Sequence, residues 1–185
     1  MLKFKFFLLS LSILFFSACG TEELMDYALD QGSDADDPAV DVIIPETDQI
    51  ASMIQRSNEI RGEASVLVPV TWNSYLALSA QGHANVLAES GKLEHSQTQY
   101  GENLYASFEQ ATYVDAVNAW YVEKSYYDYA SNSCIGGQEC GHYTQIIWEA
   151  TTEVGCGRAS IGTQGSSVIV CQYNPPGNIA GELPY

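Results

Sequence analysis

Apolar residues recur every three or four positions in three stretches of the chain, a spacing that is typical of amphipathic helices. The first helix is expected to begin near Asp48, a good N-cap. The second is expected to run from Trp72 to Ser90, with Gly91 as its C-terminal stop, and a third to begin after Thr112. The apolar face of the first helix consists of Ile50, Met53, Ile54, Ser57 and Ile60.

The second predicted helix, with Thr71 as its N-cap, carries a histidine within its apolar stripe. The stripe consists of Trp72, Leu76, Ala80, His83 and Leu87. A buried histidine on a core-facing stripe needs a hydrogen-bond partner. We therefore expect His83 to be a core residue that has such a partner.

Strand patterns dominate the C-terminal part of the chain. Candidate strands are residues 143–148, 154–161 and 168–174. Residues 168–171 are apolar without alternation, so the sheet should be covered on both faces. Helices on both sides of one sheet predict an α+β fold with the layers of a three-layer α-β-α sandwich.

The last two candidate strands predict a register and a disulfide. A two-residue turn at Thr163 and Gln164 would place opposite each other residues whose numbers add to 327, and Cys156 and Cys171 satisfy this relation. Directly opposed residues at a non-hydrogen-bonded position lie about 4.5 Å apart between Cα atoms. That separation is within the range of a disulfide.

The N-terminus has the pattern of an export signal. Two lysines precede an apolar run from Phe6 to Phe16, and two small residues follow it. The run is too short to span a bilayer comfortably as a permanent helix. The Phe-Ser-Ala sequence before Cys19 resembles a bacterial lipobox, which predicts cleavage after residue 18 and lipidation of Cys19. The alternative is an ordinary cleaved signal, with Cys19 in a tail.

Lipidation would tether the protein to a membrane without a transmembrane helix. Because Gly20 rather than Asp follows the cysteine, the expected destination is the outer membrane if the cell has one. We therefore expect a protein outside the cytoplasm, at the cell envelope or cell surface.

Much of the negative charge lies before the predicted domain. The formal net charge is −16, and residues 20–48 contain ten acidic and no basic residues. With their Gly, Ser and Pro residues, residues 19–48 are expected to form an acidic flexible linker. From residue 49 onward the net charge is −8. The sequence contains no basic patch that would attract nucleic acid.

If Cys19 is acylated, four cysteines remain, and an even number in an exported chain favours disulfides. The four are Cys134, Cys140, Cys156 and Cys171. A structural zinc site is the alternative, but the paired Cys-x-x-Cys or Cys/His spacings that it needs are absent.

Several short motifs follow one another between residue 51 and the C-terminus. They are Asn58-x-x-Arg61, Trp72, His95-Ser96 followed by Tyr100-Gly-Glu-Asn-Leu104, Trp120-x-x-Glu123, Gly141-His-Tyr-Thr-Gln-Ile-Ile-Trp148, and Val170-Cys-Gln-Tyr-Asn-Pro-Pro-Gly-Asn178. Together they closely resemble the CAP superfamily of cysteine-rich secretory proteins, antigen 5 and pathogenesis-related protein 1. The resemblance implies a CAP (or SCP) domain over residues 49–185 and pairs Cys134 with Cys140 as well as Cys156 with Cys171. It implies no single activity, because the family shares none.

The resemblance also implies a site. The family's cavity tetrad falls on His95, Glu102, Glu123 and His142. Two imidazoles can bind a divalent metal, with zinc as the expected ion, while the glutamates orient the rings or supply a further ligand. Two other interpretations stay open: a hydrogen-bond network that joins helices to the sheet, and a catalytic centre in which Glu102 and Glu123 serve as acid and base. The family often has a further histidine where this chain has Ser57.

Three functions are compatible with these patterns. The first, which we favour, is a lipid-anchored binding module outside the cytoplasm for a small apolar ligand or an envelope component. The second is a metal-dependent hydrolase of envelope peptides or glycans, and the third is a protein–protein interaction domain. The tyrosines of residues 126–129 offer amphipathic contact surface, or they pack in the core and at its rim. We expect a monomer.

Overall fold

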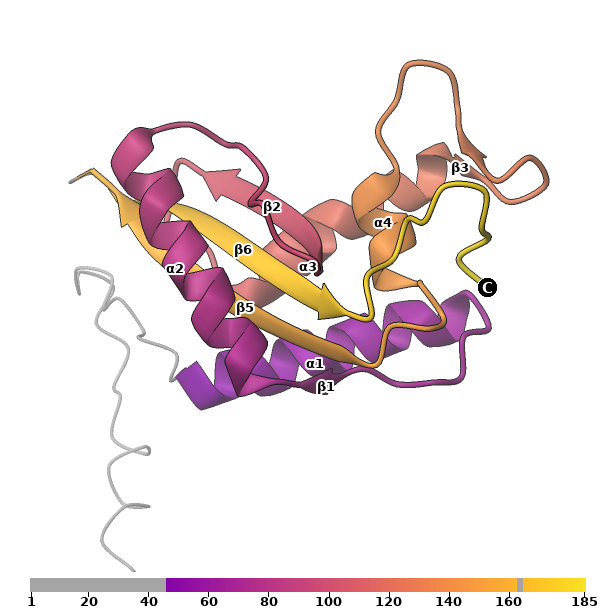
Figure 1. Cartoon of the computed structure of the whole chain (residues 1–185), viewed down its shortest axis with the longest axis horizontal. Coiled ribbons are helices and arrows are strands. Elements are labelled where there is room, and N and C mark those ends of the chain that lie inside the picture. The colour runs from indigo at the N-terminus through magenta and orange to yellow at the C-terminus, as the bar shows by residue number, and fades with distance from the viewer. Residues whose placement is uncertain (1–45, 163–164) are drawn as a thin grey trace, which may run out of the picture. The chain divides into compact units, whose positions relative to one another are not determined.

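The computed structural model describes residues 46–162 and 165–185. In this part of the chain a four-stranded sheet, in the order β1-β5-β6-β2, lies between two layers of helices (Figure 1). The strands are β1 (Thr71–Trp72), β2 (Gly101–Ser107), β5 (Glu153–Ile161) and β6 (Ser166–Asn174). The α+β three-layer sandwich expected from the sequence is confirmed.

Helices cover both faces of this sheet. Helix α2 (Ser74–Ser90) packs on one face, and α1 (Glu46–Glu63), α3 (Tyr113–Tyr121) and α4 (Gly141–Ile146) lie on the other. A 3-10 helix (Val122–Tyr126) and a small sheet of β3 (Tyr127–Asp128) and β4 (Ser133–Cys134) follow α3. Within the described residues, no helix is long and apolar enough to cross a membrane.

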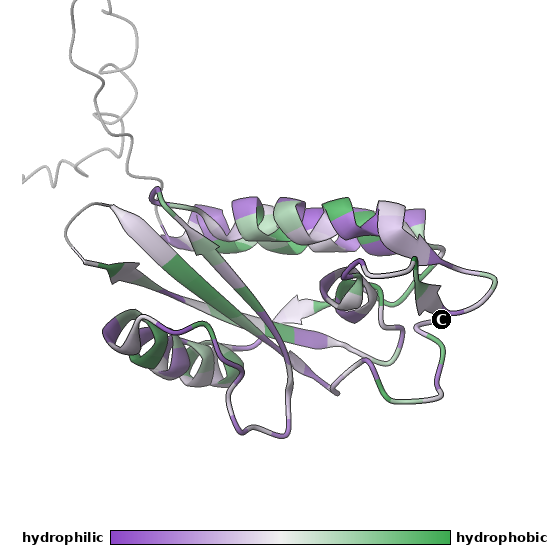
Figure 2. Cartoon of the chain, turned by 90° about the horizontal axis from the view of Figure 1, so that it is seen from above, coloured by the Kyte–Doolittle hydropathy of each residue, from purple (hydrophilic) through white to green (hydrophobic). Residues whose placement is uncertain are grey.

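The sheet has one hydrophobic core on each face. Strand β6, in the interior of the sheet, contributes side chains to both cores (Figure 2). Val168 and Val170 pack with α2, whereas Ile169, Cys171 and Tyr173 belong to the core shared with α1, α3 and α4. Successive side chains of β6 therefore point to opposite faces of the sheet. Both sets are apolar because helices cover both faces. On neighbouring β5, a Cβ atom at Gly155 would lie 2.2 Å from the backbone nitrogen of Ala77. A glycine is required there because the backbone of α2 approaches the strand so closely.

The predicted register of the last hairpin is confirmed. Glu153 pairs with Asn174 and Cys156 with Cys171, so the paired numbers add to 327. The Cys156–Cys171 disulfide is present, with its Cα atoms 4.1 Å apart, and so is Cys134–Cys140. Residues 163 and 164 of the predicted turn are outside the described residues.

Several predicted boundaries were wrong. Thr71 and Trp72 pair with β5 instead of opening α2, whose N-cap is Asn73 because its side chain accepts from the backbone of Tyr75 and Leu76. Strand β2 was not predicted. Residues 46–48, assigned to the linker, form the first turn of α1. The predicted signal peptide, Cys19 and the rest of the linker lie outside the described residues.

Residues 143–148 were predicted as a strand, but most of them form the helix α4. Their tyrosine, threonine and isoleucines have a local preference for strands. Tertiary contacts at the two ends of the segment override that preference. The Glu123 carboxylate accepts from the backbone N–H groups of His142 and Tyr143 at the N-terminus, and Arg61 donates to the carbonyls at the C-terminus.

Arg61 is a buried residue near the end of α1 that joins the loop after α1 to the end of α4. Its side chain is 1% exposed, and it donates to five backbone carbonyls, those of Val68, Ile146, Trp148, Glu149 and Thr151. Burial lowers the pKa of the guanidinium to about 10, which leaves it charged at neutral pH. The forked guanidinium therefore fixes the loop after α1 and the loop after α4 together.

We predict that Arg61→Lys lowers the free energy of unfolding by about 3 kcal/mol or more, because a single ammonium leaves several buried carbonyls unsatisfied. Urea unfolding with both disulfides intact measures this change. Arg56→Lys is the matched control, since Arg56 on the same helix is half-buried, with its side chain 24% exposed, and it donates to side chains rather than to buried backbone carbonyls. An equal and small loss in both variants would contradict the role of Arg61.

Candidate functional site

His95 lies in the loop between α2 and β2, and Glu102 on β2 holds its ring. The Nδ1 atom of His95 is 2.9 Å from Oε1 of Glu102. The same carboxylate accepts from the backbone N–H and the hydroxyl of Ser96. Gln172, opposite Glu102 on β6, donates to it from Nε2 at 3.1 Å. Four donors therefore converge on one buried carboxylate, whose side chain is 4% exposed.

These contacts determine the protonation of Glu102. Burial alone raises the pKa of its carboxyl group, but the hydrogen bonds from Ser96, Gln172 and His95 outweigh burial, so the net pKa lies below 4.5. Glu102 is thus ionised at neutral pH and can only accept. It follows that Nδ1 of His95 carries the hydrogen of this bond, and that in the neutral form of the ring Nε2 has a free lone pair.

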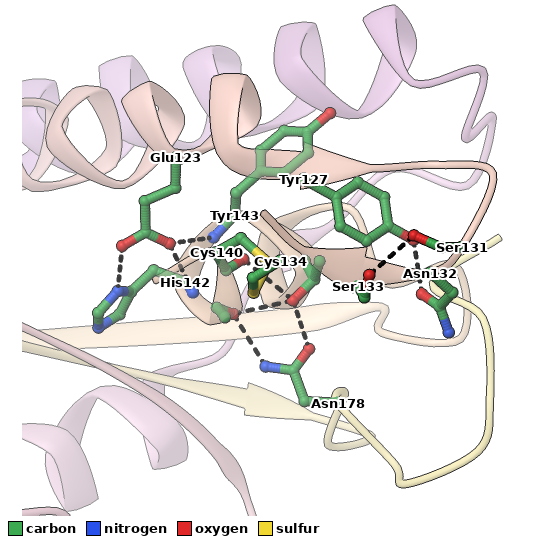
Figure 3. The surroundings of a disulfide bond; sticks show 12 residues. Glu123, Tyr127, Ser131, Asn132, Ser133, Cys134, Cys140, His142, Tyr143 and Asn178 are labelled. Carbon is green, nitrogen blue, oxygen red and sulfur yellow. Dashed lines mark hydrogen bonds and ion pairs between the residues drawn. A yellow bond between two sulfur atoms is a disulfide. The ribbon is translucent and has the colours of Figure 1, made fainter. Parts of the chain in front are cut away.

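His142, in the first turn of α4, forms an equivalent pair with Glu123 from the 3-10 helix (Figure 3). Its Nδ1 atom is 2.6 Å from Oε1 of Glu123, while Oε2 accepts from the backbone N–H groups of His142 and Tyr143. One carboxylate therefore supplies the missing acceptor at the start of α4 and also orients the imidazole. Asn178 holds α4 from the other side, through Gly141 and Thr144.

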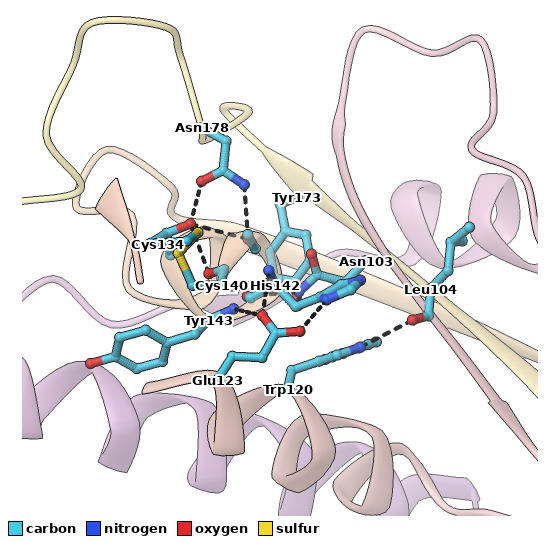
Figure 4. A network of polar contacts seen from close by, with 12 residues as sticks. Asn103, Leu104, Trp120, Glu123, Cys134, Cys140, His142, Tyr143, Tyr173 and Asn178 are labelled. Carbon is cyan, nitrogen blue, oxygen red and sulfur yellow. Dashed lines mark hydrogen bonds and ion pairs between the residues drawn. A yellow bond between two sulfur atoms is a disulfide. The ribbon is translucent and has the colours of Figure 1, made fainter. Parts of the chain in front are cut away.

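Trp120 and Asn103 complete the surroundings of His142 (Figure 4). The Trp120 ring stacks on the imidazole with 6.0 Å between centroids and 13° between planes, and its Nε1 donates to the Leu104 carbonyl. Asn103 donates from Nδ2 to the carbonyl of His142. The histidine is thus held through its ring, its backbone N–H and its backbone carbonyl.

The two histidines line one pocket of about 150 Å³. Its lining residues are His95, Glu102, Asn103, Glu139, Gly141, His142 and Asn178. Glu123 lies behind His142 and does not line the pocket. Three members of the predicted tetrad therefore share one cavity, and the fourth reaches it through His142.

Sequence reasoning missed several parts of this site. Asn103, Gln172 and Asn178 lie within the quoted motifs, but Gln172 gains its role only through the pairing of β2 with β6, and β2 was not predicted. Glu139 stands in no quoted motif. Ser96 lies beside His95, but its hydroxyl donates to Glu102. No Ser–His pair of the kind found in hydrolases is formed between them.

The third histidine, His83, lies close to this site on α2. Its Nε2 atom is 2.8 Å from the carbonyl oxygen of Glu94 and 4.0 Å from Oε1 of Glu102. The expectation of a hydrogen-bond partner is confirmed. The side chain is 15% exposed, so it lies at the edge of the core rather than inside it.

The chemistry of the site fits a divalent metal in part. Each imidazole has its Nδ1 fixed by a carboxylate, the arrangement that often supports metal-binding histidines, and no described residue hydrogen-bonds to either Nε2. Against this, the described residues contain no group of three or more His, Cys, Asp or Glu that could hold an ion. The two imidazoles are therefore the protein ligands that this site could provide, and water molecules would complete the coordination of a bound ion.

The comparison with known families decides the classification. The family model for the cysteine-rich secretory protein family, CAP, matches residues 54–173.

This chain belongs to the CAP family.

Pathogenesis-related protein 1A of Nicotiana tabacum is a similar CAP relative, 46% identical over 129 residues, which are 69% of this chain and 76% of the relative. Among solved structures, venom allergen-like protein 4 of Schistosoma mansoni superposes with a TM-score of 0.60 at 23% identity, covering 77% of this chain and 95% of the other. NaASP2 with Zn²⁺ gives a TM-score of 0.61 at 20% identity, covering 80% and 90%. These structural matches bear on the fold.

Proposed function

We propose that this CAP protein is a binding module outside the cytoplasm whose His95–His142 pocket holds a divalent metal, with zinc as the best candidate. The main support is the pair of imidazoles on one pocket, each with Nδ1 fixed by a glutamate and Nε2 unpaired among the described residues. Zinc accepts neutral imidazole nitrogen readily. The similarity in fold to NaASP2, solved with Zn²⁺, adds support.

The chain's own residues would orient the two imidazole ligands. Glu102 and Glu123 hold the two rings, and Trp120 limits rotation of His142 by stacking. A bound zinc ion would supply a Lewis acid with positions open to water or to a ligand group. Asn103, Glu139 and Asn178 on the pocket wall would contact a ligand that enters.

The hydrolase alternative has weaker support. An acid–base catalyst needs a carboxylate that is free to take up a proton. Glu102 accepts from four donors and has a lowered pKa, and Glu123 accepts from three. Both carboxylates serve as orienting groups. Glu139, exposed on the pocket wall, is the carboxylate that this alternative would require as its base.

A small apolar ligand also has weaker support than a metal. The tyrosines near residue 127 pack on one another, with 4.8 Å between the ring centroids of Tyr127 and Tyr129 and a hydrogen bond between the hydroxyls of Tyr129 and Tyr143. Tyr127 is buried in this packing and Tyr129 stays 43% exposed, so only part of the tyrosine surface is free to contact a ligand. A second pocket, between α4 and the C-terminal segment, measures about 280 Å³, at or below the lower limit for drug-sized ligands.

The proposed location rests on two features. The two disulfides fit an oxidising compartment, and the lipobox-like sequence before Cys19 suggests a lipid tether. The tether would place the binding pocket at the surface of the envelope, where an envelope component or a protein partner is within reach.

The test uses residues 20–185, which lack Cys19 and therefore carry no lipid. Calorimetry should record heat of binding when zinc is added to this protein. The double variant His95→Ala, His142→Ala should lose this binding while keeping its unfolding temperature within a few degrees. His83→Gln is the control, because it removes the third histidine and should bind zinc as the wild type does. Affinity should be modest, since two protein ligands are available. Equal heats from wild type and the double variant would favour a purely structural network.

For the tether, Cys19→Ser should release the protein from membranes or leave an unprocessed precursor. The wild-type protein should carry an acyl modification on its first residue in mass spectrometry of the membrane fraction. A mature chain that carries no acyl group would refute the anchor without affecting the zinc proposal.

A further inference from the structure

The outer face of α2 is an exposed apolar surface. Tyr75 is 85% exposed, Leu78 is 74% exposed and Val86 is 55% exposed. With Gly82 these residues follow the spacing of one helix face. Helix α2 stands alone on its side of the sheet among the described residues, so none of them covers this face (Figure 2). The inner face of the same helix is buried through Leu76, Ala80, Ala84 and Leu87.

This face is also nearly uncharged. Of the exposed residues of α2, Glu89 is the one that carries a charge. The surrounding domain, from residue 49 onward, has a net charge of −8. Two copies of such a domain repel each other over most orientations. An approach through α2 brings together the surfaces with the least like charge.

The order of residues on this face is self-complementary. In an antiparallel pair of α2 helices that cross at Gly82, residues at equal distances from Gly82 lie opposite each other. Leu78 then faces Val86 of the other copy, and Ser79 faces Asn85. Tyr75 faces Glu89, so the carboxylate meets a phenol hydroxyl instead of a second carboxylate. Apolar residues meet apolar residues, and polar residues meet hydrogen-bonding partners, on both sides of the two-fold axis.

Gly82 at the crossing point supports this arrangement. A glycine in the interior of an exposed helix lowers stability relative to most other residues. A Cβ atom at Gly82 would meet nothing within 4 Å, so packing inside the domain does not require glycine here. The absence of a side chain does allow a second helix backbone to approach closely.

From these observations we propose that a second copy of this chain docks on α2 in an antiparallel, two-fold arrangement centred on Gly82. The helix has 17 residues, about 25 Å in length. Stable dimers bury roughly 1,000 Å² or more of total surface, whereas this contact would use a single helix from each copy. The dimer should therefore be weak and in rapid equilibrium with the monomer, and it does not depend on the metal site.

Sedimentation equilibrium of residues 20–185, from about 10 µM to 1 mM, tests this proposal. The wild type should move from monomer towards dimer mass over this range. Gly82→Glu places two carboxylates face to face and should remain monomeric. The matched control is Gly62→Glu on α1, another exposed helical glycine with nothing within 4 Å of its Cβ position, and it should associate as the wild type does.

Circular dichroism melting should show that both variants remain folded, because a Cβ atom at either position meets nothing within 4 Å. A wild type that stays monomeric at about 1 mM would overturn the proposal. So would a Gly82→Glu variant that associates as strongly as the wild type, because the contact would then lie on another face.

Discussion

The arrangement of α4 and of the loop that follows it depends on one constraint, the buried guanidinium of Arg61. It reaches from α1 to the carbonyls of Ile146 and Trp148 at the end of α4. A charged group this deep in the core is tolerated because carbonyl oxygens surround it. Their positions are fixed in return, since each depends on the same rigid fork. The path of the chain after α4 and the end of α4 itself are therefore set by one side chain on the first helix.

Glu123 performs the complementary task at the other end of α4. Its carboxylate accepts from the first turn of the helix and from the ring of His142. The six-residue helix is thus held between a cation at its C-terminus and an anion at its N-terminus, the arrangement that the helix dipole favours. Because the same carboxylate caps the helix and orients the imidazole, fold and site are not separable at this point. The role of His142 follows from how α4 is held.

Some features of the fold are determined by residues that are close together in the sequence, and others by residues that are far apart. The hairpin of β5 and β6, its disulfide and the start of α3 after Thr112 depend on near neighbours along the chain, so pattern and spacing were sufficient to predict them. Helix α4 was mistaken for a strand because its own residues favour a strand and the deciding contacts come from Arg61 and Glu123, far away in sequence. The four tetrad residues were found by motif resemblance.

The parts of the site that were not predicted depend on contacts between segments that are far apart in the sequence. Gln172 contacts Glu102 because β6 pairs with β2, a partnership between segments about seventy residues apart. Glu139 lines the pocket from the loop that the Cys134–Cys140 disulfide closes. Neither placement follows from a residue's own neighbours, and the motifs did not include Glu139.

Each glutamate holds Nδ1 of its histidine, so Nε2 is the nitrogen left without a partner among the described residues. Long-range ¹H–¹⁵N NMR of the metal-free protein at about pH 8, where unperturbed imidazoles are neutral, reports the tautomer of each ring directly. We expect His95 and His142 to carry the proton on Nδ1, and His83, which donates from Nε2 to the Glu94 carbonyl, to carry it on Nε2. A proton on Nε2 of His95 or His142 would show instead that the glutamate does not hold Nδ1–H of that ring.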